Sequence, residues 1–162
     1  MIYPEFFPDD RIAEKAELNV FNQLKKLSDT YDIFYSRKFI TDGIGKKPEY
    51  EVDFIIAIPE KAIICLEVKG GIINYSGIRD EWSQNSRIMH KRPDSQASSA
   101  SHALVKGFYE DIGNMAIGWG LCFPDGDLGS KALPASIDSN QIIDQLSLLH
   151  MDMALEYLFD FI

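Results

Sequence analysis

The chain contains little of what several protein classes require. Its 162 residues include only two cysteines, Cys65 and Cys122. They form no CxxC pair and lie inside apolar runs, so we expect buried free thiols and a reducing, cytoplasmic compartment. No apolar run approaches the roughly 18 residues that cross a bilayer, and we predict no membrane segment. The first residues also lack the basic and apolar regions of a secretory signal.

Several catalytic signatures are missing as well. The chain has neither G-x-G-x-x-G nor G-x-x-x-x-G-K-[ST], which argues against the common nucleotide-binding enzymes. Its three histidines, His90, His102 and His150, have no metal-ligand spacing, and we interpret them as non-catalytic. Any chemistry must therefore come from carboxylates, amines and amides.

Composition predicts one globular domain over residues 1–162. The chain has a mass of 18.4 kDa, with 46% hydrophobic and 25% charged residues, which is ordinary for a folded domain and excludes a disordered chain. We expect a core over about 10–125, followed by a strand and an acidic helix over about 140–162.

Positively charged residues are almost absent from the last third of the sequence. Residues 107–162 hold one Lys or Arg against nine Asp or Glu, whereas residues 60–106 hold seven against five. The net charge of −9 therefore arises largely from the C-terminal segment. Because the local field matters more than the total charge, a basic middle segment keeps nucleic acid open as a partner.

Hydrophobic periodicity predicts an α/β protein with a mixed central sheet and flanking helices. The segment Thr41–Pro48 is interpreted as a loop, and Asp9 and Asp10 are expected to cap the first helix. We predict helices over 11–27, 95–111 and 148–161, and strands over 33–35, 50–58, 62–68, 72–75, 82–84, 115–123 and 142–143.

The first predicted helix carries one residue that does not fit its amphipathic pattern. Its apolar side chains cover one arc of the helical wheel, and Glu17 falls at the edge of that arc between Leu24 and Phe21. Glu17 is either a rim glutamate whose stem packs on the core or a carboxylate directed into a site.

The two longest apolar strands are separated by Pro59-Glu60-Lys61 and should form a central hairpin. A turn centred on Glu60 pairs residues whose numbers sum to 120. Asp53 then faces Glu67 and Glu51 faces Lys69 on one face, while Val52 faces Val68 and Phe54 faces Leu66 on the apolar face. Directly opposed residues have Cβ atoms about 4.5–5.5 Å apart.

Two carboxylates at that distance repel each other unless a divalent cation lies between them. Mg²⁺ prefers oxygen ligands and keeps several waters, and Lys69 could reach a metal-bound water or a phosphate oxygen. This set suits metal-assisted phosphodiester hydrolysis. The alternative is a structural ion pair between Asp53 and Lys69, with Glu51 a solvated or salt-bridged neighbour.

These residues carry a family resemblance. Asp53, thirteen intervening residues and then Glu67-Val68-Lys69 resemble the (P)D…(D/E)-x-K signature of the restriction-endonuclease-like superfamily. Val52 stands where that signature has proline. More narrowly, four stretches covering about 10–125 resemble the nuclease-related domain family, NERD. They are Ala13–Glu17 with Val20, Phe21 and Leu24; Tyr50–Ile56; Cys65–Gly71; and Pro93 with Gln96 and Ala97.

The resemblance implies a restriction-endonuclease-like fold and a nuclease that uses Mg²⁺ or Mn²⁺, often as one module of a larger protein such as a helicase. It implies metal ligation by Asp53 and Glu67, with Glu17 as a further acidic ligand. Lys69 would be the catalytic lysine, and Gln96 would support the site.

Partners follow from the same prediction. DNA is the expected substrate, with RNA left open. Arg87, Lys91 and Arg92 form either a phosphate contact or a solvated basic turn. A helicase or another partner domain, or a homodimer through the acidic C-terminal helix, is also expected. The alternative function is a nucleic-acid-binding or regulatory module that keeps the nuclease fold without cleaving.

Overall fold

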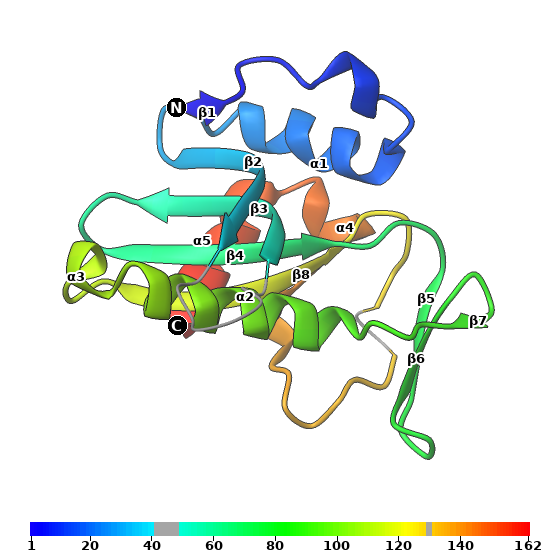
Figure 1. The fold of residues 1–162 in the computed structure, drawn as a ribbon. Coiled ribbons are helices and arrows are strands. Elements are labelled where there is room, and N and C mark those ends of the chain that lie inside the picture. The colour runs from blue at the N-terminus through cyan, green and yellow to red at the C-terminus, as the bar shows by residue number, and fades with distance from the viewer. Residues whose placement is uncertain (41–48, 129–130) are drawn as a thin grey trace.

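A computed structural model describes residues 1–40, 49–128 and 131–162. Its centre is a mixed six-stranded sheet (Figure 1), in which β2, β3 and β4 are antiparallel and the other pairings are parallel. This confirms the predicted mixed α/β class and places the predicted hairpin, β3–β4, at the centre. In sheet order the strands are β1 (Ile2–Tyr3), β2 (Asp32–Ile40), β3 (Glu49–Ile58), β4 (Ala62–Val68), β8 (Ala116–Phe123) and β9 (Ile142–Asp144).

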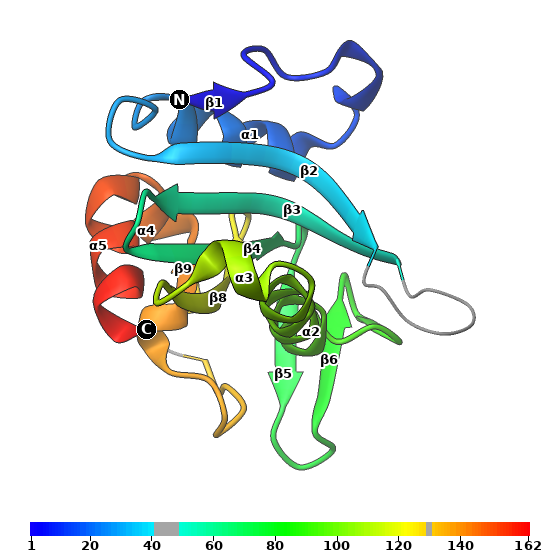
Figure 2. The ribbon, with the colours of Figure 1, turned by 60° about the vertical axis from the view of Figure 1, so that its left-hand side comes forward.

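Helices cover both faces of this sheet. Helices α1 (Lys15–Lys25) and α5 (Met151–Phe161) share one hydrophobic cluster with the sheet, and α2 (Pro93–Gly107) packs on the opposite face. Figure 2 shows α2 nearly end-on beside a small separate sheet. That sheet consists of β5 (Ile73–Ser76), β6 (Glu81–Gln84) and β7 (Arg87–Ile88). Short helices α3 (Tyr109–Ile112) and α4 (Gln145–Leu148) and 3₁₀ turns η1 (Asp9–Arg11) and η2 (Ser139–Gln141) complete the described elements.

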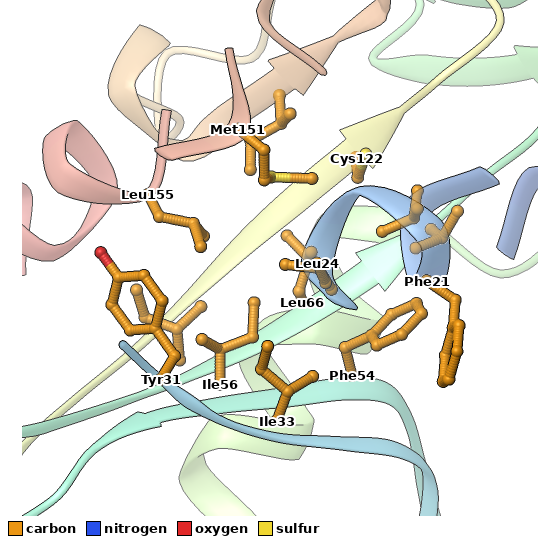
Figure 3. Close-up of a cluster of buried hydrophobic side chains, with 14 of the residues drawn as sticks. Phe21, Leu24, Tyr31, Ile33, Phe54, Ile56, Leu66, Cys122, Met151 and Leu155 are labelled. Carbon is orange, nitrogen blue, oxygen red and sulfur yellow. The ribbon is translucent and has the colours of Figure 1, made fainter. Parts of the chain in front are cut away.

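The larger hydrophobic cluster fills the space between α1, α5 and the sheet. Figure 3 shows side chains from all three converging there, including Phe21 and Leu24 of α1, Phe54 of β3 and Leu155 of α5. A second cluster lies between the sheet and helices α2 and α3. It contains Val52, Cys65, Ala100, Leu104 and Ile112. Burial of both sheet faces explains why β3 and β4 consist largely of apolar residues.

The start of the first helix differs from the prediction. Residues 9–11 form η1, α1 begins only at Lys15, and neither Asp9 nor Asp10 provides a side-chain cap. Instead, Arg11 extends from η1 to β2 and β3, where its Nη2 lies 2.7 Å from Ser36 Oγ and 3.2 Å from Glu51 Oε1. These tertiary contacts hold the separate turn in place, and helical periodicity could not reveal them.

Two other helices also differ from the prediction. The predicted helix 95–111 becomes α2 and α3, with a break at Phe108, whose φ of −127° is not helical. The predicted helix 148–161 corresponds to α5, which begins only at Met151, after His150 with its φ of −126°; of the predicted range, only Leu148 belongs to α4. Strand β2 extends well beyond the predicted 33–35, and β1 and β7 were not predicted. The loop predicted over Thr41–Pro48 lies outside the described residues.

Both cysteines are buried free thiols, as predicted. Burial raises the pKa of Cys65 to about 12, so the thiol stays protonated and inert. Within the described residues, no helix combines the length and hydrophobicity needed to cross a membrane.

Asp144 holds the chain together where β9 passes into α4. Its carboxylate accepts hydrogen bonds from the backbone N–H groups of Leu128, Leu146 and Ser147, at 3.0–3.2 Å. Burial disfavours the charged form, but these bonds outweigh it and lower the pKa of Asp144 below its ordinary value.

We therefore predict that Asp144→Ala lowers the free energy of unfolding by about 1–3 kcal/mol, because three N–H groups lose their acceptor. The pKa is depressed in the folded state, so the difference from wild type is fully present above the ordinary Asp pKa. It is lost as the pH falls through the lowered value. Urea unfolding at several pH values measures this, with exposed Asp160→Ala as the control; an unchanged Asp144→Ala curve would contradict the assignment.

Candidate active site

The hairpin has the predicted register only over its first half. β3 and β4 pair from Ile58 with Ala62 to Phe54 with Leu66, and the numbers of each pair sum to 120. Beyond that point the predicted pairs Val52–Val68, Asp53–Glu67 and Glu51–Lys69 are not formed. The backbone N–H of Val68 instead donates to Asp53 Oδ2 at 2.8 Å. The carboxylate of Asp53 thus takes the place of a backbone acceptor in the β3–β4 ladder, and the two strands separate beyond this point.

The ladder between β2 and β3 is interrupted at the same residue. Tyr35 pairs with Phe54 and Arg37 with Val52, but Ser36 and Asp53 between them do not pair. Ser36 has a φ of +50°, a conformation rare for a residue other than glycine. Phe54 packs in the cluster under α1, whereas Val52 packs in the cluster under α2. The prediction that both lie on one apolar face is therefore wrong, because β3 changes face at Asp53.

Asp53 and Glu67 are nevertheless electrostatic neighbours. Glu67 is only 6% exposed, and Asp53 is half-buried. Burial, and then the negative charge of Glu67, raise the pKa of Asp53 well above its ordinary value, against the opposing hydrogen bond from Val68. Burial also raises the pKa of Glu67, against the positive charge of Lys69. The pair is a desolvated cluster of like charge that a cation would stabilise.

Lys69 lies directly beside this pair. Its Nζ donates to Glu67 Oε1 at 2.6 Å, and its backbone N–H donates to the carbonyl of Cys122 in β8 at 2.9 Å. The neighbouring Gly70 allows α1 to approach, because a Cβ there would lie 2.8 Å from the Cβ of Ala16. The end of β4 therefore positions both the amine and the first turn of α1.

Glu17 reaches the cluster from α1. Its negative charge raises the pKa of both Asp53 and Glu67, so the three carboxylates are electrostatic neighbours. The hydroxyl of Tyr35 donates to Glu17 Oε2. Tyr35 is 2% exposed and its ring packs against those of Phe7, Phe21 and Phe54. Burial first, and then this hydrogen bond, raise the pKa of Tyr35.

Tyr35 and Arg11 were not predicted from the sequence. The guanidinium carbon of Arg11 lies 5.8 Å from the centroid of the Tyr35 ring, and the same guanidinium forms an ion pair with Glu51 at 3.2 Å. Glu51 therefore pairs with Arg11 rather than facing Lys69. The only sequence signal was the break in helical periodicity at Glu17, which indicated a polar partner but not its identity.

Gln96 lies in the first turn of α2, between two grooves. One groove of about 600 Å³ extends along Lys69 and Arg87, and a second of about 640 Å³ extends toward Lys38 and Tyr50. Both are lined by His90, Lys91 and Gln96. The Oε1 atom of Gln96 is buried and has no hydrogen-bond partner among the described residues, so it can accept a bond from a water or from a bound molecule.

The three predicted phosphate contacts separate into two kinds. Arg87 and Lys91 are exposed and line the first groove. Arg92 lines the second groove, but its guanidinium pairs with Asp94 at 2.9 Å and Asp80 at 3.0 Å. We interpret Arg92 as an anchor between the small sheet and α2 rather than a free phosphate contact, a distinction that charge clustering alone could not make.

A metal centre of three ligands is not assembled in this geometry. Across 1–40, 49–128 and 131–162, no group of three or more His, Cys, Asp or Glu side chains is arranged to hold an ion. Asp53 and Glu67 still offer hard oxygen donors, whose pKa values are raised by burial first and then by neighbouring carboxylates. Two carboxylates with several waters fit Mg²⁺ or Mn²⁺. Glu17 lies near both carboxylates, where it accepts a hydrogen bond from the hydroxyl of Tyr35.

The raised pKa of Asp53 predicts that its charge lowers the free energy of unfolding of the domain. We expect Asp53→Asn to raise the free energy of unfolding at neutral pH by about 0.5–2 kcal/mol, because the amide removes a buried charge and its oxygen still accepts from Val68. The folded pKa of Asp53 is raised, so the gain is full above that pKa and disappears as the pH falls to the ordinary Asp value. Thermal unfolding across this range measures it; a variant less stable than wild type at neutral pH would contradict it.

Comparison with known proteins identifies a similar fold and a family. The crystal structure of protein VC1899 from Vibrio cholerae is similar in fold, with a TM-score of 0.51 and 13% identity. The match covers 95% of this chain but only 37% of that one. No curated protein matches the chain. The family model of the nuclease-related domain matches residues 12–119, a range that includes Asp53, Glu67 and Lys69. Since this match spans more than half of the sequence, the chain belongs to the nuclease-related domain (NERD) family.

Proposed function

We propose that this domain is a metal-dependent nuclease that hydrolyses phosphodiester bonds in DNA. The observation that carries the proposal is the buried, mutually repelling pair Asp53 and Glu67, with the amine of Lys69 at 2.6 Å from Glu67. Perturbed carboxylates cluster at functional sites, and two carboxylates beside one amine supply the metal ligands and the positive charge that metal-assisted hydrolysis of a phosphodiester can use.

Each residue has a separate role. Asp53 and Glu67 would hold Mg²⁺ or Mn²⁺, which when bound neutralises phosphate charge and acidifies a water. Lys69 orients the attacking water or contacts the phosphate, and the unpartnered oxygen of Gln96 accepts a hydrogen bond from that water or from the lysine. Glu17, held by Tyr35, acts as an outer carboxylate.

A second candidate is a non-cleaving nucleic-acid-binding module with the same fold. It is favoured by the ion pair between Lys69 and Glu67, which already neutralises one carboxylate, and by the hydrogen bond that engages Glu17. In either case, residues 1–162 would act as one cytoplasmic module, and a helicase, another partner domain or a second copy is a proposed partner.

A cleavage assay on plasmid and oligonucleotide DNA separates the two candidates. We expect Asp53→Asn and Lys69→Ala each to lower the Mg²⁺-dependent cleavage rate by at least about 10²–10³-fold, because each removes a charge that acts on the transition state. The matched controls Glu60→Gln and Lys61→Ala change exposed residues in the turn of the same hairpin and should cleave like wild type.

Metal binding provides an independent readout. Mg²⁺ should raise the melting temperature of wild type by mass action and have little effect on Asp53→Asn. Wild type that binds metal and DNA without cleaving would leave only the non-cleaving module. Retained cleavage in Lys69→Ala would remove the lysine from the mechanism.

Tyr35 is expected to act as a positioning residue. Tyr35→Phe keeps the packed ring but removes the hydroxyl that holds Glu17. We expect Mn²⁺ affinity, measured by calorimetry, to fall about tenfold, and the Mg²⁺ concentration for half-maximal cleavage to rise similarly. Tyr31→Phe is the control, since the ring of Tyr31 stacks on Phe159 of α5 and its hydroxyl does not hold Glu17. Equal metal affinity in Tyr35→Phe and wild type would show that the hydroxyl is only structural.

A further inference from the structure

We infer that the two grooves around Lys91 and Gln96 hold a single strand of DNA, so that the substrate is unpaired DNA rather than a duplex. This rests on the proposed function and deepens it. Neither the family match nor the similar crystal structure assigns these grooves or the form of the nucleic acid.

The grooves form one path past the site. Because both are lined by His90, Lys91 and Gln96, they meet at the start of α2. From there, one extends to β6 and β7 along Lys69 and the other to β2 and β3. Each has about 600 Å³, within the range of pockets for small ligands. A few nucleotides of one strand fit this space.

Positive charge is concentrated along the first groove, whereas the second groove is also lined by the carboxylate of Glu51. The lining of the first groove includes Lys69, Arg87 and Lys91, and neither Arg87 nor Lys91 forms an ion pair with a described residue. On the α1 side of the site, the guanidinium of Arg11 lies near Glu14 and Glu17 and pairs with Glu51, which itself lines the second groove. One phosphate backbone is thus attracted along the first groove, and a second, running over α1, would meet the carboxylates of Glu14 and Glu17.

The first groove also offers apolar surface to bases. Ile88 of β7 is 56% exposed at its edge, and the half-buried Met89 lines it next to Lys91. Single-strand binding combines a basic groove with side chains that contact the faces of unpaired bases. In a duplex those faces are stacked and hidden, so Ile88 and Met89 would gain nothing from it.

Fluorescence anisotropy with the non-cleaving Asp53→Asn variant tests this inference. The probes are a labelled oligothymidylate of about 12 nucleotides and a hairpin duplex of the same length, both with Ca²⁺ present. We expect the single strand to bind at least about tenfold more tightly. Arg87→Ala and Lys91→Ala should each weaken binding and lower the salt slope by about 0.7, the value for one phosphate contact on a single strand.

Two further variants separate charge from base contact. Ile88→Ala should weaken single-strand binding several-fold without changing the salt slope, because it removes apolar contact surface and no charge. Lys106 is an exposed lysine in the last turn of α2 and lines neither groove. The control variant Lys106→Ala should therefore bind the single strand like wild type. Melting temperatures confirm that each variant is folded.

The outcomes are distinguishable from failure of the nuclease proposal. Equal or tighter binding of the duplex, or unchanged single-strand affinity in Arg87→Ala and Lys91→Ala, would overturn the inference. Wild type that cleaves duplex but not oligothymidylate would also overturn it, while supporting the nuclease. Tight single-strand binding without cleavage by wild type would support the inference and refute the nuclease.

Discussion

The organisation of this site depends on two carboxylates that the fold keeps close together and away from water. Ionised Asp53 and Glu67 repel each other, and burial adds to the penalty. Lys69 compensates part of it through its ion pair with Glu67, and Asp53 is stabilised by the N–H of Val68 and by the charge of Lys69. Keeping such a pair in a partly desolvated site costs stability, since apolar residues would pack there without the electrostatic penalty. The repulsion is therefore the physical feature that any bound cation would relieve.

The surrounding structure is arranged to maintain that pair. Strands β3 and β4 separate where Asp53 takes over a backbone donor, and Ser36 interrupts the neighbouring ladder at the same position. Gly70 allows α1 to approach closely enough to present Glu17. The ring of Tyr35 is fixed by the aromatic core while its hydroxyl reaches that carboxylate. The site is thus continuous with the hydrophobic core, and its geometry follows from packing rather than from a mobile loop.

Sequence predicted the parts of this arrangement that depend on local patterns. Strand alternation and the turn at Glu60 determine the first half of the hairpin register, and the helical wheel identified Glu17 as out of place. The rest depends on tertiary contacts that have no period. Nothing local shows that Asp53 displaces a ladder bond or that β3 changes face, and Tyr35 resembles any aromatic strand residue. In the sequence, Arg92 cannot be distinguished from the nearby basic residues, and only the structure shows that it pairs with Asp80 and Asp94.

Charge segregation reconciles a net charge of −9 with a nucleic-acid partner. The acidic side chains of the C-terminal segment include the exposed Asp152, Glu156 and Asp160 of α5. Helix α5 packs on the α1 face of the sheet, whereas the grooves with Arg87 and Lys91 border α2 on the opposite face. The sheet therefore lies between the two charges. Exposed charges farther apart than about 8–10 Å are largely screened at physiological salt. An approaching phosphate backbone thus responds to the basic groove in front of it, and the total charge of the chain is a poor guide to what this face binds.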